Sequence, residues 1–312
     1  MYIYKLFGLI VQTDVKLFGN QVSCDAKPEV RMIQGDLQRI TDEINDIIYC
    51  EENKESQIPT IISRHLKKES IVFVRNVGLF RISNGTLIEY NCYKTKDDLQ
   101  FQQWLMAMAF SILIIQREKI LLHGTVLKDC NNDKVIGICG ESGAGKSTIG
   151  NELLKRGLQF ISDDEILIDI KDAAYTLLTY PWRRICMDVF ESEKIDKEKA
   201  YYFEDGKKQK YVVDMTDECI DNLQKLDKLF ILSLSDCENV EIEEIVGADK
   251  INLIIDNLYK KTVYEEVGIA PNMFKDIVSI AKYVDIYLVK RPINKMTIDE
   301  ITTNILNIMG GE

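Results

Sequence analysis

The chain has 312 residues, of which 46% are hydrophobic and 29% are charged, and its formal net charge is −11. This is the composition of a globular protein, and the length allows one large domain or two ordinary ones. The acidic balance argues against a nucleic-acid partner, because phosphates require a concentrated basic surface.

The cysteines and the N-terminus indicate the compartment. None of the eight cysteines is spaced as Cys-x-x-Cys, so the sequence predicts neither a zinc site nor a redox motif. The first residues, MYIYKLFGLIVQTDV, lack the basic leader and the cleavage site of a signal peptide. The longest apolar run, Trp104 to Ile115, is shorter than a membrane span. We therefore expect a cytoplasmic protein with no membrane partner.

The first part of the chain is predicted to be rich in strands. Its opening segment, YIYKLFGLIV, is dominated by β-branched and aromatic residues. The later segment IVFVRNVGLFRISNGTLIEYN predicts strands with turns at residues 76–78 and at Asn84-Gly85. Between them, QRITDEINDIIYCEENKES favours a helix that runs into a loop. Residues 1–95 are therefore predicted to form a small β-rich α+β domain.

The next segments alternate between helix and strand. DDLQFQQWLMAMAFSILIIQREK is apolar on nearly every face and predicts a buried helix that an aspartate near Asp97 can begin. ILLHGTVL and VIGICG predict two strands joined by the turn KDCNNDK. KSTIGNELLKRG predicts a helix that ends at Gly157, and LQFISDDEILIDI predicts two strands around a polar interruption.

The remaining segments complete a second, larger domain. A hairpin is predicted around Asp205-Gly206, followed by the apolar strand LDKLFILSLS, the helix APNMFKDIVSIAKY and the strand VDIYLVKR. The closing helix, MTIDEITTNILNIM, has a capping box from Thr297 to Glu300. Residues 96–312 are therefore predicted to form an α/β domain with a mixed sheet and helices.

The segment GESGAGKS at residues 140–147 matches the phosphate-loop pattern Gly-x-x-x-x-Gly-Lys-Ser, between a predicted strand and a predicted helix. Gly140, Gly143 and Gly145 allow backbone N–H groups to face phosphate oxygens. The helix that follows directs its positive N-terminus at the same phosphates. The sequence therefore predicts a nucleotide site.

Within this loop, Lys146 can reach the β- and γ-phosphates, and the hydroxyl of Ser147 can bind Mg²⁺. Thr148 is expected to cap or pack, and Ser142 could touch a phosphate. The predicted nucleotide-binding residues are Gly140, Glu141, Ser142, Gly143, Ala144, Gly145, Lys146, Ser147 and Thr148.

Two adjacent carboxylates, Asp163 and Asp164, follow the predicted strand after the loop helix. If that strand lies beside the loop strand, both carboxylates fall near the γ-phosphate, where phosphoryl transfer needs a metal ligand. One carboxylate can bind the metal, and the other can orient an incoming hydroxyl. The alternative is a polar turn between two strands. His123, at the end of an apolar strand, is a further candidate, although a lone histidine is usually structural.

Taken together, LLHGTVL, GESGAGKST, LLKRG and ISDD resemble the HPr kinase/phosphorylase superfamily in content, order and spacing. ATP-dependent phosphoenolpyruvate carboxykinases share a related nucleotide-binding core. The resemblance implies a phosphate-loop kinase domain with ATP and Mg²⁺ as cofactors. It implies that one of Asp163 and Asp164 is the catalytic base and the other supports the metal beside Ser147. We assign Asp163 as the base and Asp164 to the metal, with the reverse order left open, and the resemblance places His123 beside them.

The segment YPWRRICMDVFESEK lacks the glycine-rich signature that the bifunctional enzymes carry after the paired aspartates, so reversal of the phosphorylation is not expected. The chain is more similar to HPr-kinase-like enzymes encoded with ribosomal peptides, including those that phosphorylate lasso-peptide precursors. FGLIVQTDVKLF, YPWRRI and AKYVDIYLVKRPINKMTIDEI carry this looser similarity.

These observations predict an ATP-dependent kinase for a serine hydroxyl on a peptide. A kinase for a free small molecule such as an amino acid and a non-catalytic ATP-binding regulator are the alternatives. Arg183, Arg184 and Lys210 could contact phosphate or a peptide carboxylate, or they could be solvated surface charges. The resemblance also suggests a homo-oligomer.

Overall fold

The computed structural model describes residues 1–19, 21–23, 25–44, 61–192, 195, 197–205 and 208–310. Its contacts divide the chain into two compact units. The first unit comprises Met1–Glu118, Phe203–Asp205 and Thr262–Ile269, and the second comprises Lys119–Tyr202, Gly206–Lys261 and Ala270–Glu312. The first unit thus extends to Glu118, whereas the sequence analysis placed the domain boundary after residue 95.

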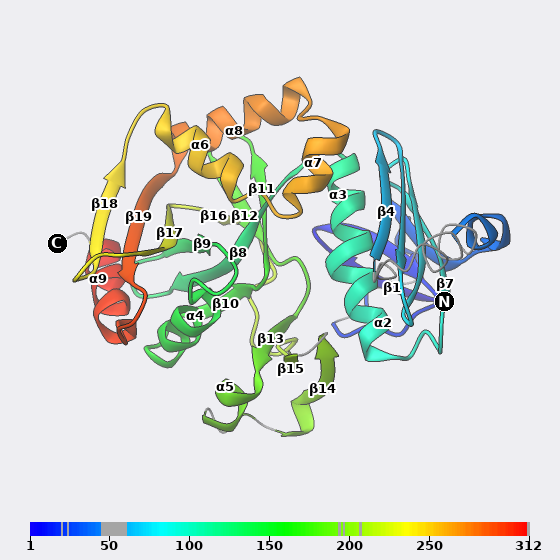
Figure 1. The fold of residues 1–312 in the computed structure, drawn as a ribbon, viewed down its shortest axis with the longest axis horizontal. Coiled ribbons are helices and arrows are strands. Elements are labelled where there is room, and N and C mark those ends of the chain that lie inside the picture. Colours follow the sequence, from blue (N-terminus) through cyan, green and yellow to red (C-terminus); the bar gives the residue numbers. More distant parts are fainter. Residues whose placement is uncertain are drawn as a thin grey trace, which may run out of the picture. The chain divides into compact units, whose positions relative to one another are not determined.

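The first unit is built on a seven-stranded sheet with the strand order β1-β2-β3-β7-β6-β5-β4 (Figure 1). The predicted turn at Asn84 and Gly85 joins β6 to β7, and both residues have the positive φ that asparagine and glycine tolerate. Residues 38–44 are helical, and the rest of the predicted helix, through residue 56, lies outside the described residues. The strands are β1 (Tyr2–Leu6), β2 (Leu9–Thr13), β3 (Val30–Gln34), β4 (Ile61–Leu66), β5 (Glu69–Val74), β6 (Gly78–Ser83) and β7 (Leu87–Cys92).

One continuous helix of the first unit consists of α2 (Leu99–Trp104), the π-helical η1 (Leu105–Phe110) and α3 (Ser111–Gln116). It begins at Asp98, whose side chain accepts a hydrogen bond from the Phe101 N–H at 3.1 Å. Within the described residues it is the one helix long and apolar enough to cross a membrane, with a mean hydropathy of 1.2. It is therefore longer than the apolar run identified from the sequence. However, 72% of it is buried inside the protein, as in a core helix.

The main sheet of the second unit has the order β16-β12-β11-β8-β9-β17-β19-β18, and β10 also pairs with β8. Strands β9, β17 and β19 are parallel, so their C-terminal ends lie at the same edge. The strands are β8 (Ile120–Asp129), β9 (Lys134–Gly140), β10 (Gln159–Ser162), β11 (Glu165–Ile170), β12 (Ala174–Leu177), β16 (Gln224–Lys225), β17 (Lys228–Ser235), β18 (Glu241–Ile245) and β19 (Asp285–Pro292).

Helices cover both faces of the main sheet. On one face, α4 (Lys146–Lys155) and α9 (Ile298–Gly310) enclose a core with buried side chains such as Ile138, Phe230 and Ile305. On the other face lie α6 (Asp249–Asp256) and α8 (Pro271–Tyr283) (Figure 1). The helix α7 (Lys261–Val267) follows α6 in the chain and belongs, from Thr262 onward, to the first unit.

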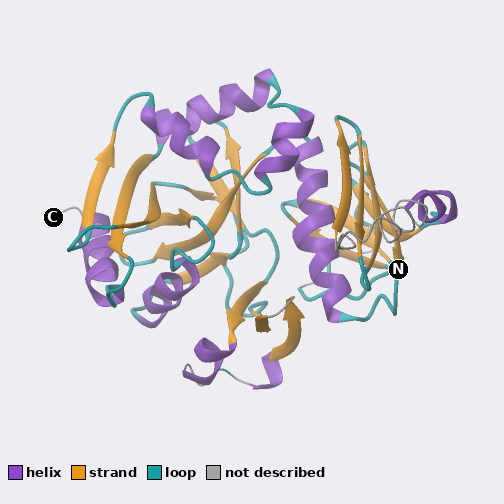
Figure 2. Ribbon diagram, viewed as in Figure 1, coloured by secondary structure: helices purple, strands orange, loops and turns teal. Residues whose placement is uncertain are grey.

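A small sheet with the order β13-β15-β14 stands apart from the main sheet, as the ribbon coloured by secondary structure shows (Figure 2). Its buried side chains Ile185 and Val213 pack against Phe160 of β10. The elements are β13 (Trp182–Cys186), α5 (Met187–Ser192), the 3-10 helix η2 (Lys197–Lys199), β14 (Ala200–Asp205) and β15 (Lys208–Asp214).

Two details differ from the sequence predictions. The strand before the acidic pair, β10, and the strand after it, β11, both pair with β8, so β8 separates them from the loop strand β9. The capping box at α9 does not form its side-chain bond, because the buried Thr297 hydroxyl has no partner among the described residues. Helix α9 nevertheless begins at Ile298, where a backbone bond joins Ile301 to Thr297.

Candidate functional site

The predicted phosphate loop joins the end of β9 to the start of α4. Gly140, Gly143 and Gly145 have φ values of 136°, 87° and 101°, in the region where a side chain is strained. At Gly140 space is also lacking, since a Cβ atom there would lie 2.4 Å from the carbonyl oxygen of Leu232 on β17. The loop therefore requires its glycines for both conformation and packing.

Lys146, the first residue of α4, extends back along the loop. Its Nζ donates to the carbonyl oxygens of Gly140 at 2.7 Å and of Glu141 at 3.0 Å. An ammonium group has three donors, so one N–H remains for a ligand oxygen. Burial lowers the pKa of Lys146, and the negative charges of Asp163 and Asp164 oppose this shift.

The other loop residues differ in exposure. Ala144 is buried and packs in the core below the loop, whereas Glu141, Ser142 and Gly143 are exposed. Ser147 and Thr148 are also exposed at the first turn of α4. The Ser147 hydroxyl is therefore accessible to a bound ion, as the sequence analysis requires.

Asp163 is held from two sides. Its Oδ1 atom accepts a hydrogen bond from the hydroxyl of Thr125 on β8 at 2.7 Å. Its Oδ2 atom accepts from the backbone N–H of Arg184 on β13 at 3.2 Å. The side chain is only 8% exposed, yet each carboxylate oxygen retains a lone pair for another donor.

Asp164 has a positive φ of 69°, which is uncommon for a residue other than glycine. Its Oδ2 atom accepts from the guanidinium of Arg184 and from the hydroxyl of Tyr259, the latter at 2.7 Å. Burial by itself would raise the pKa of Asp164, but the charge of Arg184, with help from His123 and Tyr259, holds it well below its ordinary value. Asp164 is therefore a carboxylate throughout the neutral range.

His123 joins this cluster from β8. Its Nδ1 atom lies 3.0 Å from the backbone carbonyl oxygen of Asp164. A carbonyl can only accept, so Nδ1 carries the proton and Nε2 retains its lone pair. Burial lowers the pKa of His123, and the negative charge of Asp164 only partly opposes this. His123 is therefore neutral at pH 7.

Of the three basic candidates, Arg184 is placed in the cluster by its bonds to Asp164. Arg183 is only 8% exposed, and its Nη2 atom has no hydrogen-bond partner in the part of the chain that the structure describes. Lys210 lies on β15 opposite Cys186. Contacts of Arg183 and Lys210 with a substrate stay a prediction.

Sequence reasoning missed Thr125 and Tyr259. Thr125 lies two residues after His123 on the same strand, and this spacing could have indicated that both side chains share a face of the sheet. Tyr259 lies in the turn after α6, where its N–H donates to the carbonyl oxygen of Leu121 at 2.8 Å. No sequence motif marks Tyr259.

A cavity of about 600 Å³ opens beside His123 and the beginning of the loop, at Gly140 and Glu141. Polar and apolar side chains line it in similar numbers. The other lining residues are Ile231, Leu232, Ser233, Leu253, Asp256, Asn257, Leu258, Lys261 and Leu288. The cavity is large enough for part of a small molecule or for one or two peptide side chains.

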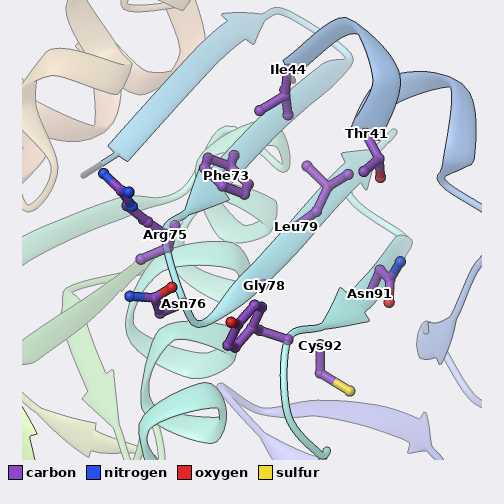
Figure 3. Close-up of a pocket in the computed structure, with 11 residues that line it drawn as sticks. Thr41, Ile44, Phe73, Arg75, Asn76, Gly78, Leu79, Asn91 and Cys92 are labelled. Atoms are coloured by element: carbon purple, nitrogen blue, oxygen red, sulfur yellow. The ribbon is translucent and has the colours of Figure 1, made fainter. Parts of the chain in front are cut away.

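A second cavity, of about 390 Å³, lies within the first unit (Figure 3). Ile44 of the short helical segment, Phe73 of β5 and Leu79 of β6 line its apolar part. Arg75 and Asn76 lie at the turn between the two strands. No residue of the predicted site lines this cavity.

The donor set fits a magnesium ion bound together with a nucleotide. Among the described residues, no three His, Cys, Asp or Glu side chains are grouped so that they could hold a metal by themselves. Magnesium in nucleotide sites needs only one or two protein oxygens, since phosphates and water supply the others. The exposed Ser147 hydroxyl and the carboxylates of Asp163 and Asp164 are oxygen ligands of the required kind.

The chain was compared with protein families, with curated proteins and with solved structures. No family model matches the chain, and no curated protein has significant sequence similarity to it. A solved structure of the Hpr(Ser) kinase/phosphatase from Coxiella burnetii has 13% sequence identity, covering 60% of this chain and 89% of that chain. Its TM-score is 0.30.

Proposed function

We propose that the protein is an ATP- and Mg²⁺-dependent kinase that transfers the γ-phosphoryl group to a serine hydroxyl, with a peptide as the acceptor. One observation carries the proposal. Thr125 donates to Asp163 at 2.7 Å and also lies against the loop helix α4, where a Cβ atom on Gly150 would be 3.4 Å from its Cγ2 atom. The two carboxylates of Asp163 and Asp164, from a different part of the sheet, therefore adjoin the helix that begins at Lys146. A protein that only binds nucleotide needs no second carboxylate there.

The proposed step is an in-line displacement at the γ-phosphorus. The acceptor oxygen forms a bond to phosphorus, and the bond from phosphorus to the β–γ bridging oxygen breaks. The hydroxyl proton passes to the carboxylate of Asp163, and the electron pair of the broken bond stays on the β-phosphate of ADP. Positioning and electrostatic stabilisation supply most of the rate enhancement in such reactions.

The chain's own residues have distinct parts in this step. The loop N–H groups and the third N–H of Lys146 bind the phosphates. Asp163 orients the acceptor hydroxyl and accepts its proton, and Thr125 fixes the carboxylate. Ser147 and Asp164 would hold Mg²⁺, which when bound neutralises charge on the phosphate oxygens. His123 stands at the boundary between these groups and the cavity.

We assign the cavity beside His123 to the acceptor. Its position at the beginning of the loop, next to the residues that would surround the γ-phosphate, supports this assignment. A peptide acceptor is further supported by the first unit, whose seven-stranded sheet ends at β4, whereas at its other end Gln21 already bridges to Tyr4 of β1. An extended peptide can add to an edge strand through main-chain hydrogen bonds. A small-molecule acceptor would need only the cavity.

The test is phosphotransfer to a candidate peptide, sought first among short peptides encoded next to this gene. Mass spectrometry after incubation with ATP and Mg²⁺ should show one added phosphate on a serine. Lys146→Ala should abolish the transfer, whereas Lys155→Ala, at the exposed end of the same helix, should not. ATP binding by the wild-type protein without transfer to any peptide or amino acid would favour a non-catalytic regulator.

The remaining assignments belong to the same proposal. We propose a cytoplasmic enzyme that acts on no nucleic acid and at no membrane. Self-association into a homo-oligomer is also proposed, and the measured mass of the protein in solution tests it.

A further inference from the structure

Arg291, near the end of β19, lies at the same edge of the sheet as the phosphate loop. The parallel ladder pairs Gly140 with Leu232 of β17, and two residues further along β17 it pairs Leu234 with Arg291 of β19. Strands β17 and β19 therefore continue past the point where β9 ends and the loop begins. This topology brings a side chain from residue 291 to a loop about 150 residues earlier in the sequence.

The guanidinium of Arg291 lies against the last glycine of the loop. A Cβ atom on Gly145 would lie 3.1 Å from Nη1 and 3.7 Å from Cζ of Arg291. Gly145 immediately precedes Lys146 and forms the N-terminal boundary of α4. The guanidinium is thus beside the positive end of the helix whose first residue is Lys146.

Among the residues that the structure describes, the Arg291 guanidinium has no counter-ion. Its Nε atom is buried and has no hydrogen-bond partner, and no carboxylate of the described residues forms an ion pair with it. Arg184, in contrast, is paired with Asp164. A buried guanidinium N–H without a partner is costly, and an anionic ligand would remove that cost.

We infer that Arg291 binds the polyphosphate of the nucleotide, as a second cation beside Lys146. The inference rests on the proposed function, because it assigns a further contact in the same site. The planar fork of arginine matches phosphate oxygens and can bridge two of them, whereas Lys146 acts as a point charge. Arg291 lies within the segment AKYVDIYLVKRPINKMTIDEI, but no role was predicted for it from the sequence.

The test measures the affinity of the purified full-length protein for ATP, and for inorganic tripolyphosphate as a competitor that has no base. Arg291→Ala should weaken the binding of both about 10- to 100-fold, the range for a hydrogen bond between charged groups. Arg291→Lys should recover part of this loss, because it restores the charge but not the fork. The matched control is Lys295→Ala, which removes an exposed positive charge from the chain that follows β19.

Each outcome has a defined meaning. Unchanged ATP affinity in Arg291→Ala would overturn the inference while leaving the proposed kinase in place. A loss of ATP affinity without a loss for tripolyphosphate would overturn it too, because the arginine would then contact the base. If the wild-type protein binds no ATP, the proposed function itself fails. Thermal unfolding shows whether Arg291→Ala is folded. If it is not, the ATP affinity of Arg291→Lys, which keeps the charge, is compared with that of the wild-type protein.

Discussion

The guanidinium of Arg184 donates to the Oδ2 atom of Asp164, which ties the small sheet to the acidic pair beside the phosphate loop. The backbone N–H of the same arginine donates to Asp163 at 3.2 Å. One residue of β13 therefore fixes both carboxylates, one through its side chain and the other through its backbone. The small sheet is thus part of the proposed site.

Removal of the Arg184 side chain should destabilise the protein. Arg184→Ala leaves the Asp164 carboxylate without its cation, and breaking a buried ion pair costs about 3 to 5 kcal/mol. Because each partner keeps 18% of its side-chain surface exposed, we expect the lower end, about 3 kcal/mol. Urea unfolding measures the change. The double variant Arg184→Ala/Asp164→Asn should be more stable than Arg184→Ala alone, and equal or lower stability would contradict a charge-based explanation.

Asp163 should matter for catalysis more than for nucleotide binding. Asp163→Asn keeps the shape but removes the proton acceptor, and loss of a general base lowers kcat about 10²- to 10⁴-fold. The dissociation constant for ATP should change little. Asp133→Asn, in the exposed turn between β8 and β9, is the matched control. If Asp163→Asn retained the wild-type kcat, Asp163 would not be the base, and Asp164 or His123 would be the candidates for that role.

The loop and its flanking elements could be predicted because their signals are local. Glycines at positions 140, 143 and 145 encode the turn, and apolar patterns encode the strand before it and the helix after it. The end of α4 is encoded locally too, because Gly157 has the positive φ that ends the helix, as the sequence predicted. Such features depend on a few neighbouring residues and not on the rest of the fold.

The order of strands was not predictable in this way. The sequence analysis considered the acidic strand as a neighbour of β9, but β8 lies between them. The hairpin of β8 and β9 was predicted, yet nothing in the local pattern shows which free edge of that hairpin receives β10 and β11. Strand order is decided by packing among elements that are distant in sequence.

The partners of the acidic pair were missed for the same reason. Tyr259 is 95 residues from Asp164, and only the tertiary fold brings its hydroxyl to the carboxylate. From the sequence, Arg184 could contact a substrate anion or be a solvated surface charge, and the structure gives it an anionic partner within the chain. The sequence shows that a residue is basic, but it does not show whether that residue contacts a carboxylate of the chain or an anionic substrate.

Filling the cavity should affect the acceptor and spare the nucleotide. Leu253 of α6 lines the cavity and is partly buried, so Leu253→Trp would occupy space that the acceptor needs. We expect the KM for the acceptor to rise about tenfold, which corresponds to the loss of about 1.4 kcal/mol of binding energy. The affinity for ATP, measured by calorimetry, should stay within about twofold.

The control for this variant is Val246→Trp, since Val246 is 70% exposed and lines neither cavity. It adds the same indole to the surface of the second unit. If Leu253→Trp weakened ATP binding as much as acceptor binding, the cavity would hold the nucleoside and not the acceptor.

The two histidines should make the protein less stable in mild acid. Burial lowers the pKa of both His65 and His123 below the ordinary value of 6.5, although Glu266 and Asp164 respectively oppose the shift. As pH falls below about 6.5, the unfolded chain takes up protons that the folded protein does not, so stability decreases, by at most about 1.4 kcal/mol per pH unit for each histidine. Above that pH both states are neutral and the effect vanishes. Urea unfolding between about pH 8 and pH 5 should show this decline, and His123→Gln and His65→Gln should each remove part of it. A decline of unchanged size in the double variant would assign the acid sensitivity to the carboxylates.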